Sequence, residues 1–149
     1  DSRYATVLQL LRKQIVEQPR TASGGFWHKK IYPNQMWLDG LYMGEPFYAQ
    51  YTTQFENGVK LDDIAYQFEL IQLQATDPKP GLLYHGWDES KQMPWADKTT
   101  GCSPNFWSIC NILLFCSVVN TTSSLFNKCA ARSMSFDIIY IMDYIGYNK

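Results

Sequence analysis

Apolar residues recur at helical spacing in three stretches of the chain. In the first, residues 2–18, apolar positions three and four apart form one face, which the breaker pair Gln18-Pro19 ends. The second runs from Leu38 to Phe55 and contains Pro46, which either kinks a helix or begins a new first turn. The third follows an Asn57-Gly58 turn. One helical face of this stretch comprises Leu61, Ile64, Ala65, Phe68, Gln72 and Ala75. Each pattern predicts an amphipathic helix.

The segments around these helices are rich in aromatic and acidic residues. One such cluster runs from Phe26 to Phe47, and a second, from Tyr84 to Trp107, has neither a helical nor a strand period. Loops this long are usually functional or disordered, and their aromatic content argues against disorder. No stretch before residue 108 alternates as a useful strand would, so the pattern predicts an all-α fold of antiparallel helical hairpins. The long connections are expected to meet at one end and to form a common site.

Composition and charge indicate a globular domain. The chain has 149 residues, 46% of them hydrophobic, and a net charge of -1. It can fill one core, and Lys29-Lys30 is its only basic cluster, so the charge gives no reason to expect nucleic acid or an anionic membrane as a partner. No apolar run reaches the roughly 20 residues that span a bilayer. Because the chain opens at Asp1 without a methionine, a leader or an upstream domain could have been removed.

Residues 108–149 differ in composition from the rest of the chain. They contain none of the five tryptophans and none of the prolines, but three of the four cysteines. The sequence therefore predicts two parts, residues 1–107 and residues 108–149. The cysteines are Cys102, Cys110, Cys116 and Cys129. Their spacing matches no zinc-ligand pattern, so no metal or other cofactor is predicted, and a structural disulfide is the less favoured alternative.

Three strings, in this order, carry a resemblance to a known family: GGFWHKKIYPNQMWLDGLYMGEPFYAQY, DPKPGLLYHGWDES and TGCSPNFW. They resemble the unsaturated rhamnogalacturonyl hydrolases, which belong with the unsaturated glucuronyl hydrolases in glycoside hydrolase families 105 and 88. The similarity runs from about residue 24 to residue 107. It implies a six-hairpin (α/α)6 toroid, of which this chain covers about a third, in bacteria that degrade pectin, in the cytoplasm or the periplasm.

The resemblance also implies a substrate and a set of site residues. The substrate would be an oligosaccharide ending in an unsaturated uronate, an enol ether that takes a proton at C4 before water adds at C5. Asp88 of the YHGWDE string corresponds to the general acid and base, and Asp39 of the WLDG string to the carboxylate that assists it. Lys29 and Lys30 are local candidates for balancing the uronate charge. The residues expected to contact the sugar are His85, Trp37, Trp87, Trp95 and Trp107.

Structural roles are the alternative for these residues. Asp39 is also typical of a first helical turn, Asp88 of a loop cap, and each tryptophan of a core. The resemblance stops after Trp107, which predicts a truncated or frameshifted member with a divergent tail. About two hairpins cannot close the ring, so exposed helical faces would favour a homo-oligomer. The alternative functions are a non-catalytic helical module that binds carbohydrate or self-associates, and an ordinary glycosidase acting on saturated chains.

Overall fold

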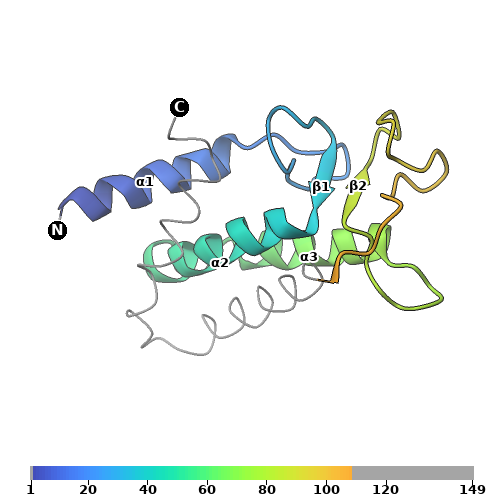
Figure 1. The fold of residues 1–149 in the computed structure, drawn as a ribbon. Coiled ribbons are helices and arrows are strands. Elements are labelled where there is room, and N and C mark those ends of the chain that lie inside the picture. The colour runs from blue at the N-terminus through green and yellow to red at the C-terminus, as the bar shows by residue number, and fades with distance from the viewer. Residues whose placement is uncertain (1, 109–149) are drawn as a thin grey trace.

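A computed structural model describes residues 2–108, and it places three helices and two short strands in them. The helices are α1 (Ser2–Glu17), α2 (Leu38–Phe55) and α3 (Leu61–Ala75). Their bounds agree with the three predicted helices, and the predicted all-α fold is confirmed. In Figure 1, α2 and α3 run side by side, and α1 extends away from the end that carries the strands. The predicted divergent tail lies outside the described residues.

Local chemistry explains where α2 and α3 begin and end. Asp39 lies in the first turn of α2, and Asp62 and Asp63 lie in that of α3, where carboxylates interact favourably with the positive end of the helix dipole. Pro46 is buried inside α2 without ending it. The turn between the two helices uses Gly58 at a φ of +76°, a conformation that side chains with a Cβ rarely adopt.

A two-stranded antiparallel sheet lies where α2 begins, and the helical pattern gave no sign of it. β1 (Gln35–Trp37) pairs with β2 (Gly86–Asp88), with Met36 opposite Trp87 and Trp37 opposite Gly86. Three residues are too few for an alternating pattern to be detected. Because β1 leads directly into α2, the sheet fixes the position of the first turn of that helix.

One face of this sheet belongs to the main hydrophobic core. The core joins α2, α3 and both strands through residues that are at most 5% exposed: Met36, Leu38, Leu41, Leu70, Ile71, Ala75, Trp87 and Cys102. Side chains alternate between the two faces of a strand, so Gln35, Trp37 and Asp88 are directed to the opposite face. One face of the sheet therefore packs in the core, and the other face holds the polar and aromatic side chains of the candidate site.

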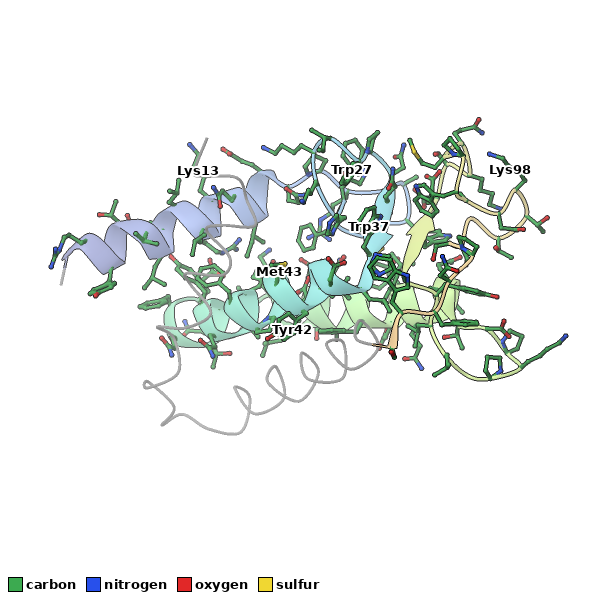
Figure 2. The ribbon with its side chains drawn as sticks, viewed as in Figure 1. Lys13, Trp27, Trp37, Tyr42, Met43 and Lys98 are labelled. Carbon is green, nitrogen blue, oxygen red and sulfur yellow. The ribbon has the colours of Figure 1, made fainter. Side chains whose placement is uncertain are left out.

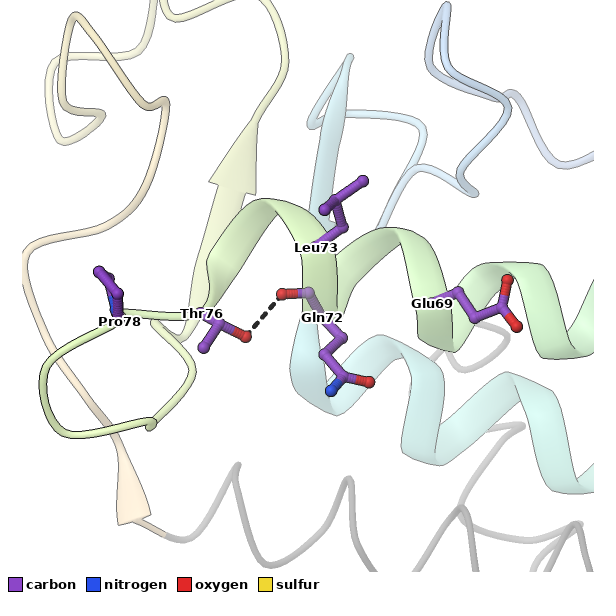
Figure 3. A pocket seen from close by; sticks show the side chains of 5 residues that line it. All are labelled: Glu69, Gln72, Leu73, Thr76 and Pro78. Carbon is purple, nitrogen blue, oxygen red and sulfur yellow. Dashed lines mark hydrogen bonds between the residues drawn. The ribbon is translucent and has the colours of Figure 1, made fainter.

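Several large apolar side chains remain exposed on the helices. Leu73 of α3 is 78% exposed, and Val16 of α1 is 68% exposed. A shallow, open hollow on α3 is lined by Glu69, Gln72, Leu73, Thr76 and Pro78 (Figure 3). These exposed apolar side chains are a feature of residues 2–108, and the homo-oligomer stays a prediction. Within residues 2–108, no helix combines the length and hydropathy needed to cross a membrane.

A buried carboxyl in α2 makes stability depend on pH. Glu45 is 3% exposed, its Oε2 has no hydrogen-bond partner among residues 2–108, and burial raises its pKa well above the ordinary 4.5. Asp63 raises this pKa further, while Arg20, which forms a bidentate pair with Asp63 at 2.6 and 2.7 Å, opposes the rise. A protonated Glu45 is therefore favoured in the folded state.

We expect Glu45→Gln to stabilise the protein increasingly as pH rises. An acid whose pKa is raised by folding contributes most stability below its unfolded pKa and loses that contribution as pH rises through the folded pKa. A tenfold change in acid strength corresponds to about 1.4 kcal/mol. Urea unfolding at pH 4 and pH 7 should show a gain for Glu45→Gln at the higher pH only. Glu69→Gln, at an exposed position of α3, is the control, and equal effects of the two substitutions would contradict the explanation.

Candidate functional site

Trp37 is directed away from the core by the strand that carries it. Its neighbours in sequence, Met36 and Leu38, are fully buried in the core, whereas the Trp37 ring lies over Gly86 of β2. A Cβ on Gly86 would stand 3.1 Å from Trp37 Cδ1, so a larger residue at that position would displace the ring. Figure 2 shows Trp37 at the junction of β1 and α2, close to the first helical turn.

Two further rings stack on Trp37 from the loop that precedes β1. The His28 ring lies 4.3 Å from the Trp37 ring at an interplanar angle of 9°, and the Tyr32 ring lies 5.2 Å away at 10°. We call His28, Tyr32 and Trp37 the aromatic stack. His28 comes this close because α2 has a glycine in its first turn: a Cβ on Gly40 would lie 2.8 Å from His28 Nδ1.

His85 joins the aromatic stack from the segment before β2. Its ring is 5.2 Å from that of Trp37, and the Trp107 ring stacks on it at 4.5 Å and 18°. The His85 carbonyl accepts a hydrogen bond from the backbone N–H of Leu38 at 3.0 Å, which ties it to the start of α2. Its Nδ1 is buried and has no hydrogen-bond partner in the described part of the chain.

The surroundings of both histidines of the site favour the neutral imidazole. The pKa of His28 is lowered to about 3, mainly by burial, with smaller contributions from the positive charge of Lys29 and from the neighbouring His85. Burial also lowers the pKa of His85, although the negative charge of Asp39 opposes this effect. Neutral imidazoles can donate or accept one hydrogen bond per nitrogen, so the site can hold polar groups without adding imidazolium charge.

Asp39 has a carboxyl oxygen that the fold does not use. It lies in the first turn of α2, and its Oδ1 is buried without a hydrogen-bond partner among residues 2–108. A carboxylate oxygen withdrawn from water and left unpaired is costly unless something else binds it. Its electrostatic effect on His85 shows that the two groups are close. Asp39, His85 and Trp37 therefore lie near one another at the start of α2.

Asp88 is placed differently, because its carboxylate is occupied by its own loop. The side chain is fully buried, and its Oδ1 accepts hydrogen bonds from Ser90 N at 3.0 Å and Ser90 Oγ at 2.6 Å. Its Oδ2 accepts one from Met93 N at 2.9 Å. Asp88 shares a sheet face with Trp37, but none of the hydrogen bonds found within residues 2–108 joins it to Asp39 or His85. The arrangement is that of a loop-capping carboxylate.

Of the other three predicted sugar-contacting tryptophans, Trp107 lies at this site, while Trp87 and Trp95 do not. Trp87 is 4% exposed in the core, and its Nε1 donates a hydrogen bond to the Thr100 carbonyl at 3.2 Å. Trp95 is partly buried in the loop after β2, and within residues 2–108 no ring contact links it to the aromatic stack. Trp107 is 52% exposed against His85. Of the predicted residues, the structure brings together Asp39, Trp37, His85 and Trp107.

Some residues that shape this region did not stand out in the sequence. His28 and Tyr32 complete the aromatic stack, and the aromatic density of their segment was the only signal. Glu89 accepts hydrogen bonds from Ala22 N at 2.6 Å, from Ser23 N at 2.8 Å and from the Ser23 hydroxyl. It thereby holds the loop before β1 against the end of β2. No local pattern could indicate a partner more than 60 residues away in the chain.

Comparison with solved structures identifies enzymes of similar fold. A glycoside hydrolase from family 105 of C. acetobutylicum ATCC 824 superposes with a TM-score of 0.81 at 40% sequence identity, covering 97% of this chain and 39% of that one. A possible family 105 member from Klebsiella pneumoniae gives a TM-score of 0.67 at 21% identity, covering 97% of this chain and 36% of that one. The latter supports the fold alone. The helical hairpins are thus part of an (α/α)6 toroid, as predicted.

Curated relatives and a family match agree with this comparison. Protein Atu3128 of Agrobacterium fabrum and the 24.9 kDa protein in picA locus of Rhizobium radiobacter are each 35% identical over 66 residues, which is 44% of this chain. The matched region spans 28% of each of these relatives. Residues 1–133 match the family described as Glycosyl Hydrolase Family 88. The chain therefore belongs to Glycosyl Hydrolase Family 88.

Proposed function

We propose that this chain carries the reactive part of a hydrolase that removes an unsaturated uronyl residue from pectin-derived rhamnogalacturonan oligosaccharides. The observation that carries the proposal is the unpaired, buried oxygen of Asp39 beside neutral His85 and the ring of Trp37. A carboxyl group with a free oxygen next to aromatic rings fits a sugar ring that must exchange a proton. Family membership supports the reaction class, and the unsaturated substrate follows from the resemblance of the WLDG and YHGWDE strings.

In the proposed reaction, one carboxyl group both donates and accepts a proton. Asp39 in its protonated form transfers its proton to C4 of the enol ether, and the positive charge that develops at C5 is shared with the ring oxygen. The Asp39 carboxylate then takes a proton from the water that adds at C5. The resulting hemiketal opens to a ketone at C5, and the hemiacetal left at C1 releases the attached sugar. The acid is restored at the end of the cycle.

The hydrogen bonding favours Asp39 over Asp88 for this role. Resemblance assigned the acid and base function to Asp88 and the assisting function to Asp39. However, both oxygens of Asp88 accept hydrogen bonds from Ser90 and Met93, whereas Oδ1 of Asp39 has no hydrogen-bond partner in the described part of the chain. Asp88 would then assist by fixing β2 and the loop after it. We therefore propose Asp39 as the proton-transfer group and Asp88 as its structural support.

Neighbouring residues have roles consistent with a uronate substrate. His85 would donate or accept a hydrogen bond at a ring hydroxyl through its unpaired Nδ1, and Trp37 and Trp107 would pack against the sugar. Lys29 is near enough to His28 to lower its pKa, so a positive charge lies beside the aromatic stack. That charge would attract the substrate carboxylate, since the two histidines are neutral.

The proposal is tested by following the ultraviolet absorbance of the substrate double bond. The purified chain should decrease this absorbance with an unsaturated galacturonyl-rhamnose disaccharide and should not cleave the saturated analogue. Cleavage of the saturated sugar instead would support an ordinary glycosidase. Binding of the unsaturated sugar without any loss of absorbance would support the non-catalytic carbohydrate-binding alternative. Either of these results would contradict the proposed reaction.

A further inference from the structure

Gln35, the first residue of β1, accepts one hydrogen bond from the Trp37 indole and one from the backbone of His28, two members of the aromatic stack. Its side-chain Oε1 accepts a hydrogen bond from the indole Nε1 of Trp37 at 3.1 Å. Its backbone carbonyl accepts another from the backbone N–H of His28 at 2.6 Å. The rings of Trp37 and His28 lie 4.3 Å apart and nearly parallel. A single residue thus contacts both partners of the closest stacked pair.

The surroundings of Gln35 make these contacts inflexible. The residue is 1% exposed, and β-sheet pairing places it directly opposite Asp88. Asp88 is itself fixed by Ser90 and Met93, so the strand that faces Gln35 cannot easily shift. A buried side chain in a paired strand has few alternative rotamers. The sheet therefore sets the direction of the Gln35 side-chain oxygen Oε1, and with it the orientation of the Trp37 indole.

We propose that Gln35 is a positioning residue that fixes the plane of the Trp37 indole within the aromatic stack. It acts through Trp37 and is not itself required to touch a substrate. The effect of this positioning on sugar binding rests on the function proposed above, because the Trp37 ring faces a sugar only if that function is correct. The consequence for the indole position is independent of that function.

The direct test is the indole N–H resonance of Trp37 in NMR spectra of the whole chain, assigned by its loss in Trp37→Phe. Gln35→Met keeps the volume but removes the acceptor, so this resonance should lose the downfield shift of a hydrogen-bonded indole. Gln35→Glu keeps an acceptor oxygen at the same place and should restore the resonance position, although a buried carboxyl opposite Asp88 lowers stability. Gln35→Glu would then be less stable than the parent chain and yet keep the parent's Trp37 resonance. A merely structural role of Gln35 does not predict this combination.

Gln67→Met provides a matched control. Gln67 is a fully buried glutamine of α3 that accepts a hydrogen bond from Phe26 N and donates one to the Gly24 carbonyl, and neither contact involves Trp37. This substitution should leave the Trp37 resonance in place. An unchanged resonance in Gln35→Met, or a resonance that Gln35→Glu does not restore, would overturn the proposal. If Gln35→Met does not fold, Gln35→Glu decides: a parent-like resonance supports the proposal and a displaced one contradicts it.

Sugar binding separates this inference from the proposed function. In a titration with the unsaturated galacturonyl-rhamnose disaccharide, Gln35→Met should weaken binding about tenfold, the effect of losing one hydrogen bond that orients a contact surface. Gln35→Glu should bind more tightly than Gln35→Met. If the parent chain does not bind the sugar, the proposed function fails, while the indole resonance still decides whether Gln35 positions Trp37.

Discussion

Replacing Asp39 with asparagine is expected to lower the rate of sugar release about a thousandfold while leaving the free energy of unfolding nearly unchanged. Positioned acid and base groups contribute roughly 10²–10⁴ in rate, and asparagine cannot donate a proton to C4 or take one from water. Oδ1 of Asp39 has no hydrogen-bond partner among residues 2–108, so the isosteric amide removes no hydrogen bond of that atom there. Initial rates from the ultraviolet assay and a urea unfolding curve would measure the two effects.

Asp88→Asn is the matched control for this experiment. Asp88 accepts hydrogen bonds on both oxygens, and an amide can accept on only one side, so a buried donor is left unpaired. That change should destabilise the protein by about 1–3 kcal/mol and lower activity through the displaced loop. Loss of stability in Asp39→Asn together with a fully stable but inactive Asp88→Asn would reverse our assignment of the two carboxylates.

Replacing Gly101 with alanine is expected to destabilise the protein by on the order of 3 kcal/mol or more. Gly101 has a φ of +83°, and a Cβ there would stand 2.4 Å from the backbone oxygen of Asp88, which cannot move aside as a flexible side chain can. The same pair of residues is joined by a hydrogen bond from Asp88 N to the Gly101 carbonyl at 2.9 Å. Alanine at position 101 would therefore push the segment around Gly101 away from Asp88 of β2. Thermal or urea unfolding would detect the change.

Gly81→Ala distinguishes backbone conformation from steric overlap. Gly81 also has a positive φ, +70°, but a Cβ there meets no atom of residues 2–108 within 4 Å. Its replacement should cost only the conformational strain, about 1 kcal/mol. If both substitutions had the same effect, the contact between Gly101 and Asp88 would not be the cause, and φ alone would explain the loss.

The helices were predictable because their causes are local. Spacing of apolar residues, the Asn57-Gly58 turn and acidic residues in first turns all act within a few positions of each other, and α2 and α3 have the predicted bounds. The family was also predictable, since long continuous strings such as MWLDGLYM and YHGWDE stand in the sequence itself. Asp39, Trp37, His85 and Trp107 were expected near one site, and the fold does bring them together.

What only the tertiary structure decided is how each of these side chains is used. Two adjacent strands of three residues direct Trp87 into the core and Trp37 out of it, a choice that pairing register makes and composition does not. Asp88 directly follows a tryptophan and Asp39 lies two residues after one. Both oxygens of Asp88 accept hydrogen bonds from its loop, whereas Oδ1 of Asp39 has no partner among residues 2–108. The sequence alone predicted the helices and the candidate site residues, because helical periods and motifs depend on residues that are close together along the chain. Contacts between distant segments determined their roles, because hydrogen bonding and burial depend on neighbours that only folding supplies.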